Sequence, residues 1–509
     1  MNYLDRNSPP TREERHNSCT AFGGSVCQLL QGSKQGCLGS GGRGFSQSSA
    51  CQMMLTLAMT GTIPESVIIF HGPVGCGSCM LSTPGISKQN QLARGNKDSI
   101  GQVWFSTNLS EQEVVGGGEE KLSRTILEAD RRFSPQVIFI AETCVPAIIG
   151  DDIDAVTKNV QGQISAKILP LHCAGFKTKV VATAYDVVYH SILRYIITDE
   201  AQKTPEFKTS IEQLEYEEKK KRTINLLNVA SMSRVDEVEL VRLLTALDLE
   251  VNILPCFAPP DRFVRAKDAA LSVSICATHD DYFVEHLKEL YGIPYILNTI
   301  PIGTDNVKKW LLEIAEFFNI TEKAEKLIAT EEAEVREALE PVLESLKGKS
   351  AFVSAGEIRA GATAILLEND LNMRVLGVRA HHYDHFGDVL FETIPRKETM
   401  QTNVGSQQPF EQVNMLLKTN PDIYLGHTGG NVWAAKLGIP VIPIFGPVNS
   451  YMGYKGIYEL AIRMERILSN PSYYKTLGST AKQPYKESWY AEDPFKYINQ
   501  TQIMEAIAP

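Results

Sequence analysis

The sequence predicts an α/β protein built from three open, mostly parallel sheets, and three observations lead to this fold class. Short, β-rich apolar runs recur along the chain, and helical patterns follow them, as in buried strands of βαβ units. Cysteines and histidines lie just after several of these runs. With 509 residues, and roughly 100–200 residues per domain, the chain has room for about three domains.

The first α/β domain is expected over residues 51–210. Its apolar runs are Ser66 to Phe70, Gln136 to Ile140 and Lys167 to Leu171. In this order, the runs end shortly before Cys76, Cys144 and Cys173.

Two further α/β domains are expected over residues 211–348 and 349–509, and the last ends in a helical segment. The strands expected in the second domain are Thr223 to Val229, Val251 to Leu254 and Leu271 to Ile275, which leads into Cys276. Those expected in the third are Ala351 to Ser354, Met373 to Val378, Asp422 to Leu425 and Val441 to Phe445. Between these two sets of strands, Thr321 to Lys349 is predicted to be a long solvated helix, interrupted at Pro341.

Residues 1–50 form an N-terminal arm of different character, rich in Ser, Gly, Gln and Arg. This composition predicts irregular chain that wraps a partner or covers a site. The arm contains Cys19, Cys27 and Cys37, whose spacing matches no defensible zinc pattern. No role is assigned to these three cysteines.

The net charge of −10 and the isoelectric point of about 5.6 argue against nucleic acid or an anionic membrane as the main partner. No apolar run approaches the ~20 residues of a membrane span, and no signal peptide is evident, so a cytoplasmic location is expected. In that compartment disulfides are rare, which makes metal binding or catalysis the better explanation for the 10 cysteines.

Cys51, Cys76 and Cys144 are the first candidates for a metal site. Cys76 lies in a Gly-Pro-Val-Gly-Cys-Gly turn, where glycines bring backbone amides close to a bulky ligand. In open α/β sheets, ligands bind beyond the carboxyl ends of the strands. Spacing alone leaves two alternatives, an iron–sulfur site assembled from distant loops or small buried core cysteines.

Several blocks of the sequence resemble the nitrogenase component-one superfamily, in particular its α-type (D-type) subunits. The blocks are His71 to Gly77, Phe105 to Leu109, Val115 to Leu122, Cys144 to Val156, Cys173 to Phe176, Tyr291 to Pro294 and Gly453 to Gly456. Together they span about residues 51–465 in the family's order. The resemblance implies Rossmann-like domains around a metallocluster cavity.

The resemblance also implies cofactors and partners. Cys51, Cys76 and Cys144 match the α-chain ligands of an eight-iron P-cluster shared with a partner subunit, and thiolates suit such clusters. Cys276 matches the cysteine that ligates one end of the large iron–sulfur active-site cofactor. The implied partners are a β-like K-type subunit in an α2β2 core and an ATP-dependent iron protein with a four-iron cluster.

The sequence departs from nitrogenase α subunits in its expected pocket. The stretch from Ile439 to Ser450 lacks the histidine that holds the far end of the cofactor. Val181 and Tyr185 stand where those subunits have glutamine and histidine. Because neither side chain replaces a histidine that positions protons near neutral pH, dinitrogen reduction is disfavoured.

Other histidines are candidates for the missing role. His381, His382 and His385 follow a predicted strand, and His427 follows another. They are expected to be cofactor ligands or proton donors, the alternative being a polar surface loop. Tyr185 is also retained as a candidate catalytic residue.

Three functions follow from this pattern. The favoured one resembles the catalytic subunit of methylthio-alkane reductases, which implies cleavage of C–S bonds in small organic sulfur compounds to methanethiol and a small hydrocarbon. The second is an E-type scaffold on which the nitrogenase cofactor matures. The third is the α subunit of an alternative nitrogenase.

Overall fold

The computed structural model describes residues 3–47, 50–77, 83–198, 207, 209–298, 300–426, 428–444, 446, 449 and 451–508. The chain forms two compact units. Unit 1 comprises residues 1–11, 50–230 and 248–297, and unit 2 comprises residues 12–49, 231–247 and 298–509. Both are mixed α/β structures with mainly parallel sheets, which confirms the predicted fold class.

Unit 1 contains a four-stranded parallel sheet in the order β4-β3-β5-β6. The strands are β3 (Ser66–His71), β4 (Val103–Ser106), β5 (Val137–Glu142) and β6 (Lys167–Leu171). The three predicted runs of this region are confirmed as β3, β5 and β6. The edge strand β4 was not predicted, and all four of its residues are only half-buried.

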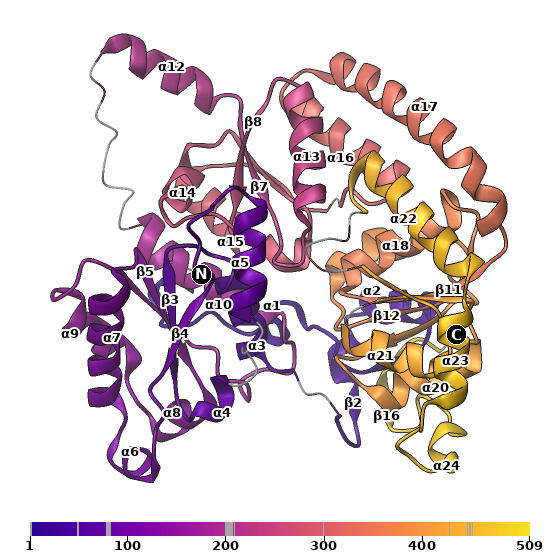
Figure 1. Cartoon of the computed structure of the whole chain (residues 1–509), viewed down its shortest axis with the longest axis horizontal. Helices are drawn as coiled ribbons and strands as arrows, with labels where there is room; N and C mark the ends of the chain where they lie inside the picture. The colour runs from indigo at the N-terminus through magenta and orange to yellow at the C-terminus, as the bar shows by residue number, and fades with distance from the viewer. Residues whose placement is uncertain are drawn as a thin grey trace. The chain divides into compact units, whose positions relative to one another are not determined.

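One face of this sheet packs against α7 (Glu119–Phe133) and α9 (Ile153–Gln161), which lie beside β3 and β5 in Figure 1. Successive strand residues point to opposite faces, so alternate positions of β3 and β5 share this core. Its strand residues are Val67, Ile69, Ile138, Ile140 and Ile168. Its helix residues are Leu122, Ile126, Ala129, Ile153, Val156 and Val160. This packing fixes the strand ends from which Cys76 and Cys144 follow.

A second parallel sheet of unit 1 has the order β10-β9-β7-β8. Its strands are β7 (Thr223–Leu227), β8 (Glu250–Leu254), β9 (Leu271–Ser274) and β10 (Tyr295–Ile296). Helix α15 (Ala277–Tyr291) follows β9 directly, and it packs against α10 (Thr183–Ile192), which follows the first sheet. Because α10 packs against α15, the segment around Tyr185 on α10 lies beside the helix that begins directly after Cys276.

Unit 2 contains a six-stranded sheet in the order β1-β13-β12-β11-β14-β15. The strands are β1 (Phe22–Ser25), β11 (Ser350–Ala355), β12 (Arg374–Ala380), β13 (Gln401–Val404), β14 (Ile423–Gly426) and β15 (Val441–Pro443). All neighbouring strands are parallel except β1 and β13. The four predicted runs of this region are confirmed as β11, β12, β14 and β15.

Helices of unit 2 include α16 (Thr304–Phe317), α17 (Thr321–Leu346), α18 (Glu357–Asn369), α20 (Pro409–Thr419) and α22 (Gly453–Ser469). Helix α17 runs alongside α22 (Figure 1) and continues through Pro341, so the predicted interruption is wrong. It buries an apolar stripe against its neighbours, including Ile328, Val335 and Leu339. Among the residues that the structure describes, no helix combines the length and apolar character needed to cross a membrane.

The N-terminal arm contains more regular structure than the sequence predicts. Helix α2 (Val26–Lys34) starts with a capping box in which Ser25 and Gln28 exchange hydrogen bonds. Strand β1 pairs antiparallel with β13, from Phe22 opposite Val404 to Ser25 opposite Gln401. Arg43 forms a half-buried ion pair with Glu411 at 2.5 Å. The arm is therefore an edge of the unit 2 sheet, because its backbone finds partners almost 380 residues away.

Candidate functional site

Three cysteines lie at the carboxyl-end side of the first sheet in unit 1. Cys51 is the N-cap of α3 (Gln52–Thr60), Cys76 lies in α4 (Val74–Gly77) after β3, and Cys144 opens α8 (Cys144–Ile149) after β5. All three are half-buried. Burial raises the pKa of the Cys76 thiol, and the proximity of Cys144 and Cys51 raises it further. The three predicted ligands are therefore electrostatic neighbours.

Gly175, in the loop after β6, provides the space for two of these thiols. A Cβ atom at this position would lie 2.9 Å from Cys51 Cβ, 3.2 Å from Cys51 Sγ and 3.7 Å from Cys144 Sγ. Only a residue without a side chain lets the backbone approach sulfur this closely. Among the described residues, these thiols do not form a single-ion group with donors within 4.8 Å of one another.

The turn that carries Cys76 rests on a buried polar network. His71 Nε2 lies 2.9 Å from Asp151 Oδ2, and its Nδ1 lies 3.2 Å from Thr107 Oγ1. The Asp151 carboxylate accepts the Gly118 amide at 3.0 Å, and Thr107 Oγ1 accepts the Gly72 amide at 2.9 Å. Burial lowers the pKa of His71 and outweighs the opposing effect of Asp151. His71 thus supports the turn as a neutral side chain.

We expect Gly175→Ala to reduce iron binding at the three cysteines. The added methyl group would collide with Cys51, and both backbone and thiol would have to move. Changes just outside a metal's ligands typically cost ~10–100-fold in metal affinity. Iron analysis of the purified protein measures the effect. Gly162→Ala is the matched control, because a Cβ atom there meets no atom within 4 Å. Equal iron content in both variants would contradict the role of Gly175.

Cys276 occupies the N-cap position of α15, with φ −159° and ψ 100°. Its amide donates to Ser274 Oγ at 2.9 Å, and Ser274 Oγ donates to Asp280 Oδ2 at 2.7 Å. The thiol is half-buried. The local structure therefore holds the Cys276 backbone at a fixed place, and its role as a cofactor ligand stays a prediction.

Tyr185 lies on α10 and contacts the first turn of α15. Its ring centroid is 3.9 Å from that of His279. His279 Nδ1 lies 2.5 Å from Asp280 Oδ1, which also accepts the Tyr189 hydroxyl at 2.8 Å. His279 and Asp280 were not among the predicted site residues. Their position one turn after Cys276 was the available signal.

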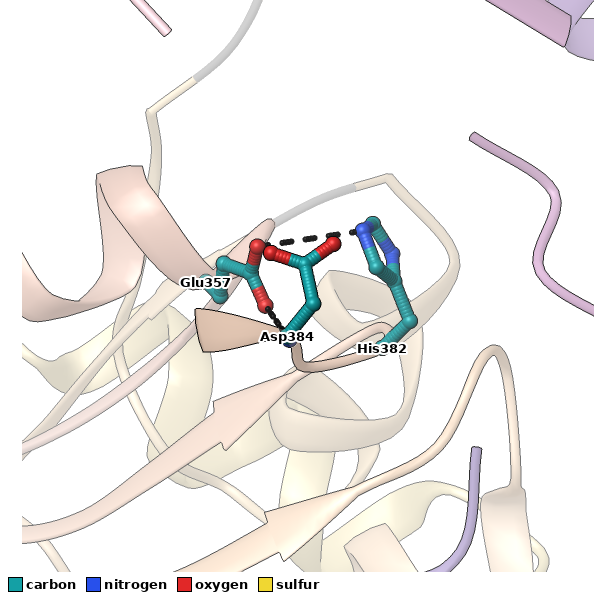
Figure 2. A group of neighbouring side chains, drawn as sticks. All are labelled: Glu357, His382 and Asp384. Atoms are coloured by element: carbon teal, nitrogen blue, oxygen red, sulfur yellow. Dashed lines mark hydrogen bonds and ion pairs between the residues drawn. The ribbon is translucent and has the colours of Figure 1, made fainter. Parts of the chain in front are cut away.

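The histidines after β12 do not share one set of contacts. Figure 2 shows His382 beside Glu357 and Asp384, with His382 Nε2 4.0 Å from Glu357 Oε1. The side chain of Glu357 also accepts the Asp384 amide at 2.8 Å. His385 is exposed and packs against the ring of His16, with centroids 5.3 Å apart. His381 is half-buried, and His427 lies outside the described residues.

Glu357, His382 and Asp384 form the one group of three potential metal donors within 4.8 Å among the described residues. Arg12 already pairs with Asp384 at 2.8 Å, and both side chains are fully buried. Burial alone would raise the pKa of Asp384, but Arg12 and then His382 outweigh it and lower that pKa to about 2. The group therefore acts as an ion-pair cluster that joins Arg12 of the arm to the segment after β12 within unit 2.

We expect Arg12→Met to lower the free energy of unfolding by about 3–5 kcal/mol, because it leaves the Asp384 carboxylate buried without its cation. Asp384 has a lowered pKa in the folded protein, so its contribution is present above the unfolded value of about 3.9. It is lost as the pH falls from about 4 towards about 2. Denaturant titrations at several pH values measure both effects.

Lys34→Met is the control for that comparison, because Lys34 pairs with Glu392 on the surface at 2.7 Å. An exposed pair contributes about 0–1 kcal/mol. Equal losses in the two variants would show that the buried pair adds no more to stability than a surface one.

Comparisons with known proteins identify the family of this chain. A family model described as nitrogenase component 1 type oxidoreductase matches residues 51–469. The nitrogenase molybdenum-iron protein alpha chain of Methanothermobacter marburgensis is 26% identical over 423 residues, covering 81% of this chain and 86% of the relative. The cofactor biosynthesis protein NifE of Nostoc sp. is 27% identical over 426 residues, covering 81% and 82%.

A solved structure titled "Nitrogenase Cp1 at pH 5" superposes with a TM-score of 0.68 at 21% identity, over 87% of this chain and 91% of that one. This likeness shows the fold. Membership in the matched family implies iron–sulfur clusters, a β-type partner subunit and a separate iron protein. Because the family model covers most of the sequence, the chain belongs to the nitrogenase component 1 family of oxidoreductases.

Proposed function

We propose that this protein is the catalytic subunit of a nitrogenase-like reductase that cleaves C–S bonds of methylthio-alkanes. The observation that carries the proposal is a complete set of cluster cysteines in a chain whose expected pocket lacks the nitrogenase histidines. The electron donor is an ATP-dependent iron protein with a four-iron cluster. The products are methanethiol and a small hydrocarbon.

In this proposal Cys51, Cys76 and Cys144 ligate an eight-iron cluster of the P-cluster type. The closeness of Cys51 and Cys144 to Gly175, and the effect of Cys144 and Cys51 on the pKa of Cys76, support it. Without metal, three neighbouring thiolates would repel one another. Iron relieves that repulsion, because each thiolate shares its electrons with the metal.

Apolar side chains next to these cysteines support a partner subunit at this surface. Val74 is 54% exposed, Ile148 is 71% exposed and Phe176 is 57% exposed. Each is within four residues of a proposed ligand or directly follows Gly175. Exposed apolar groups around a polar centre are typical of a surface that another chain covers. We therefore propose that a β-like K-type subunit completes the bridging cluster here, in an α2β2 assembly.

Cys276 is the proposed protein ligand of the second, larger cofactor. Ser274 fixes the Cys276 amide, and Asp280 in turn fixes Ser274, so the ligand is held by rigid neighbours. Tyr185 lies close by on α10 and is the proposed group that orients a substrate or passes a proton. When bound, the cofactor supplies electrons to the C–S bond that breaks.

The reaction balances as a two-electron reduction. For 2-(methylthio)ethanol, two electrons and two protons give methanethiol, ethylene and water. One C–S bond and one C–O bond break, while an S–H bond of methanethiol, an O–H bond of water and the second bond of the C=C group form. The absent pocket histidine and the substitutions at Val181 and Tyr185 disfavour dinitrogen as the substrate.

The roles of His381, His382, His385 and His427 stay predictions. His382 is buried beside Glu357, so His382→Ala would also disturb the ion-pair cluster that Glu357 and His382 form with Asp384 and Arg12. His385 is exposed, which makes His385→Ala the cleaner test of a proton-donor role.

A cofactor-maturation scaffold is the second candidate. The observation that favours it is the similarity to NifE, which is as high as that to the alpha chain. A scaffold must release its cluster and does not turn over, whereas an enzyme keeps the cluster through many electron transfers.

The test uses the chain purified without oxygen together with its β-type partner. Iron protein, ATP and a reductant are added with 2-(methylthio)ethanol, and ethylene and methanethiol are measured. We expect many turnovers per cofactor, none of them without ATP. A cofactor that moves to an acceptor protein, with no product released, would establish the scaffold instead. Ammonia formed from dinitrogen would establish a nitrogenase.

A further inference from the structure

His279 is a buried histidine with one satisfied nitrogen and one unsatisfied nitrogen. Its side chain is fully buried. Nδ1 lies 2.5 Å from Asp280 Oδ1, whereas Nε2 has no hydrogen-bond partner among the described residues. Buried polar atoms in native proteins are rarely left this way, so such an atom points to a missing ligand.

Asp280 determines how the His279 ring is presented. Its carboxylate accepts the Tyr189 hydroxyl at 2.8 Å and the Ser274 hydroxyl at 2.7 Å, in addition to facing His279 Nδ1. All of these donors are buried. A carboxylate that accepts from one ring nitrogen of a histidine fixes the ring and directs the other nitrogen outward, as in many metal sites.

The position of His279 links it to Cys276. The His279 amide donates to the Cys276 carbonyl at 2.9 Å, so the two residues lie one turn apart at the start of α15. Side chains three residues apart lie on the same side of a helix. Tyr185, which stands where nitrogenase α subunits carry a histidine, packs on the His279 ring. Together these contacts place an imidazole near the expected pocket. It belongs to α15, whereas the family's histidine corresponds to Tyr185 on α10.

We propose that His279 Nε2 directly contacts the iron–sulfur cofactor that Cys276 holds. The contact is a bond to iron or a hydrogen bond to a cluster sulfide. Asp280 is then a positioning residue, since its carboxylate contacts His279, Tyr189 and Ser274. This inference rests on the proposed cofactor site but does not depend on which substrate is reduced.

Pulsed electron paramagnetic resonance tests the contact without any assay of activity. The complex is prepared with histidine carrying 15N only in its ring, and nitrogen modulation of the cofactor signal is recorded. We expect a ring-nitrogen coupling in the unmodified chain and its loss in His279→Gln. A large coupling indicates a bond to iron, and a small one indicates a hydrogen bond to sulfide.

His286→Gln is the matched control, because His286 is buried on the same helix two turns further on, with Nδ1 2.7 Å from the Tyr282 carbonyl. It should keep the coupling. Iron in the bridging cluster and co-purification with the partner show that each variant is folded. If His279→Gln does not fold, Asp280→Asn replaces it and should alter the coupling by turning the ring.

An unmodified complex without ring-nitrogen coupling, or a coupling that survives in His279→Gln, would overturn the proposal. So would a complex in which Cys276 holds no cluster. A coupling that is lost as expected in a complex without C–S cleavage would leave the inference standing and reject only the proposed substrate. C–S cleavage by a complex without the ring-nitrogen coupling would support the proposed substrate and reject the contact of His279 with the cofactor.

Discussion

Replacing Cys76 with Ala is expected to remove most of the iron of the bridging cluster and to weaken pairing with the partner subunit. Cys76 sits beside Cys51 and Cys144, and no other described cysteine occupies its turn. Metal binding contributes directly to the stability of the structure that forms the site, so losing one ligand affects assembly as well as metal content. Iron analysis and size-exclusion chromatography of the co-expressed subunits measure the two effects.

Cys173→Ala is the matched control for Cys76→Ala. Cys173 lies in the same region, but it is fully buried and its Sγ donates to the Glu142 carbonyl at 3.5 Å. Burial raises the pKa of its thiol strongly, which disfavours the thiolate that a metal needs. We expect Cys173→Ala to keep its iron. Full iron and normal pairing in Cys76→Ala would refute the bridging-cluster assignment.

Replacing Cys276 with Ala is expected to abolish C–S cleavage while the bridging cluster stays in place. Cys276 belongs to a different sheet from the three bridging cysteines, so its loss does not touch their environment. The cofactor signal should disappear from the paramagnetic resonance spectrum. Iron content should fall only by the share of that cofactor.

Cys256→Ala serves as the comparison, because Cys256 is a fully buried cysteine that follows β8 of the same sheet. Its backbone exchanges hydrogen bonds with Asn228, so its place in the structure does not depend on a metal. We expect this variant to lose stability but not the cofactor. Activity retained in Cys276→Ala would mean that Cys276 is a core residue and that the active site lies elsewhere.

The buried strands could be predicted because their signal is local. Each of β3, β5 and β11 is covered on both faces, and such strands appear as continuous apolar runs. The edge strand β4 gave a weaker signal. Strand β1 of the arm could not be predicted, because it is short and exists only by pairing with β13.

The candidate ligands could be proposed from sequence because Cys76, Cys144 and Cys276 follow predicted strands, and because Cys51, Cys76 and Cys144 match the family's pattern. The roles of three other residues depend on the folded chain. Gly175 and Glu357 act through neighbours that are distant in sequence, and His279 was identified by a ring nitrogen without a hydrogen-bond partner among the described residues. No spacing rule contains that information.

The sequence by itself determined the fold class and the family, since both follow from local patterns along the chain; the same patterns propose the cysteine ligands. Tertiary structure alone decided that Gly175 leaves room for Cys51 and Cys144, and that Arg12 neutralises Asp384. It also decided that Asp280 orients His279 beside Tyr185. The physical reason is that packing and desolvation act between atoms that only the folded chain brings together.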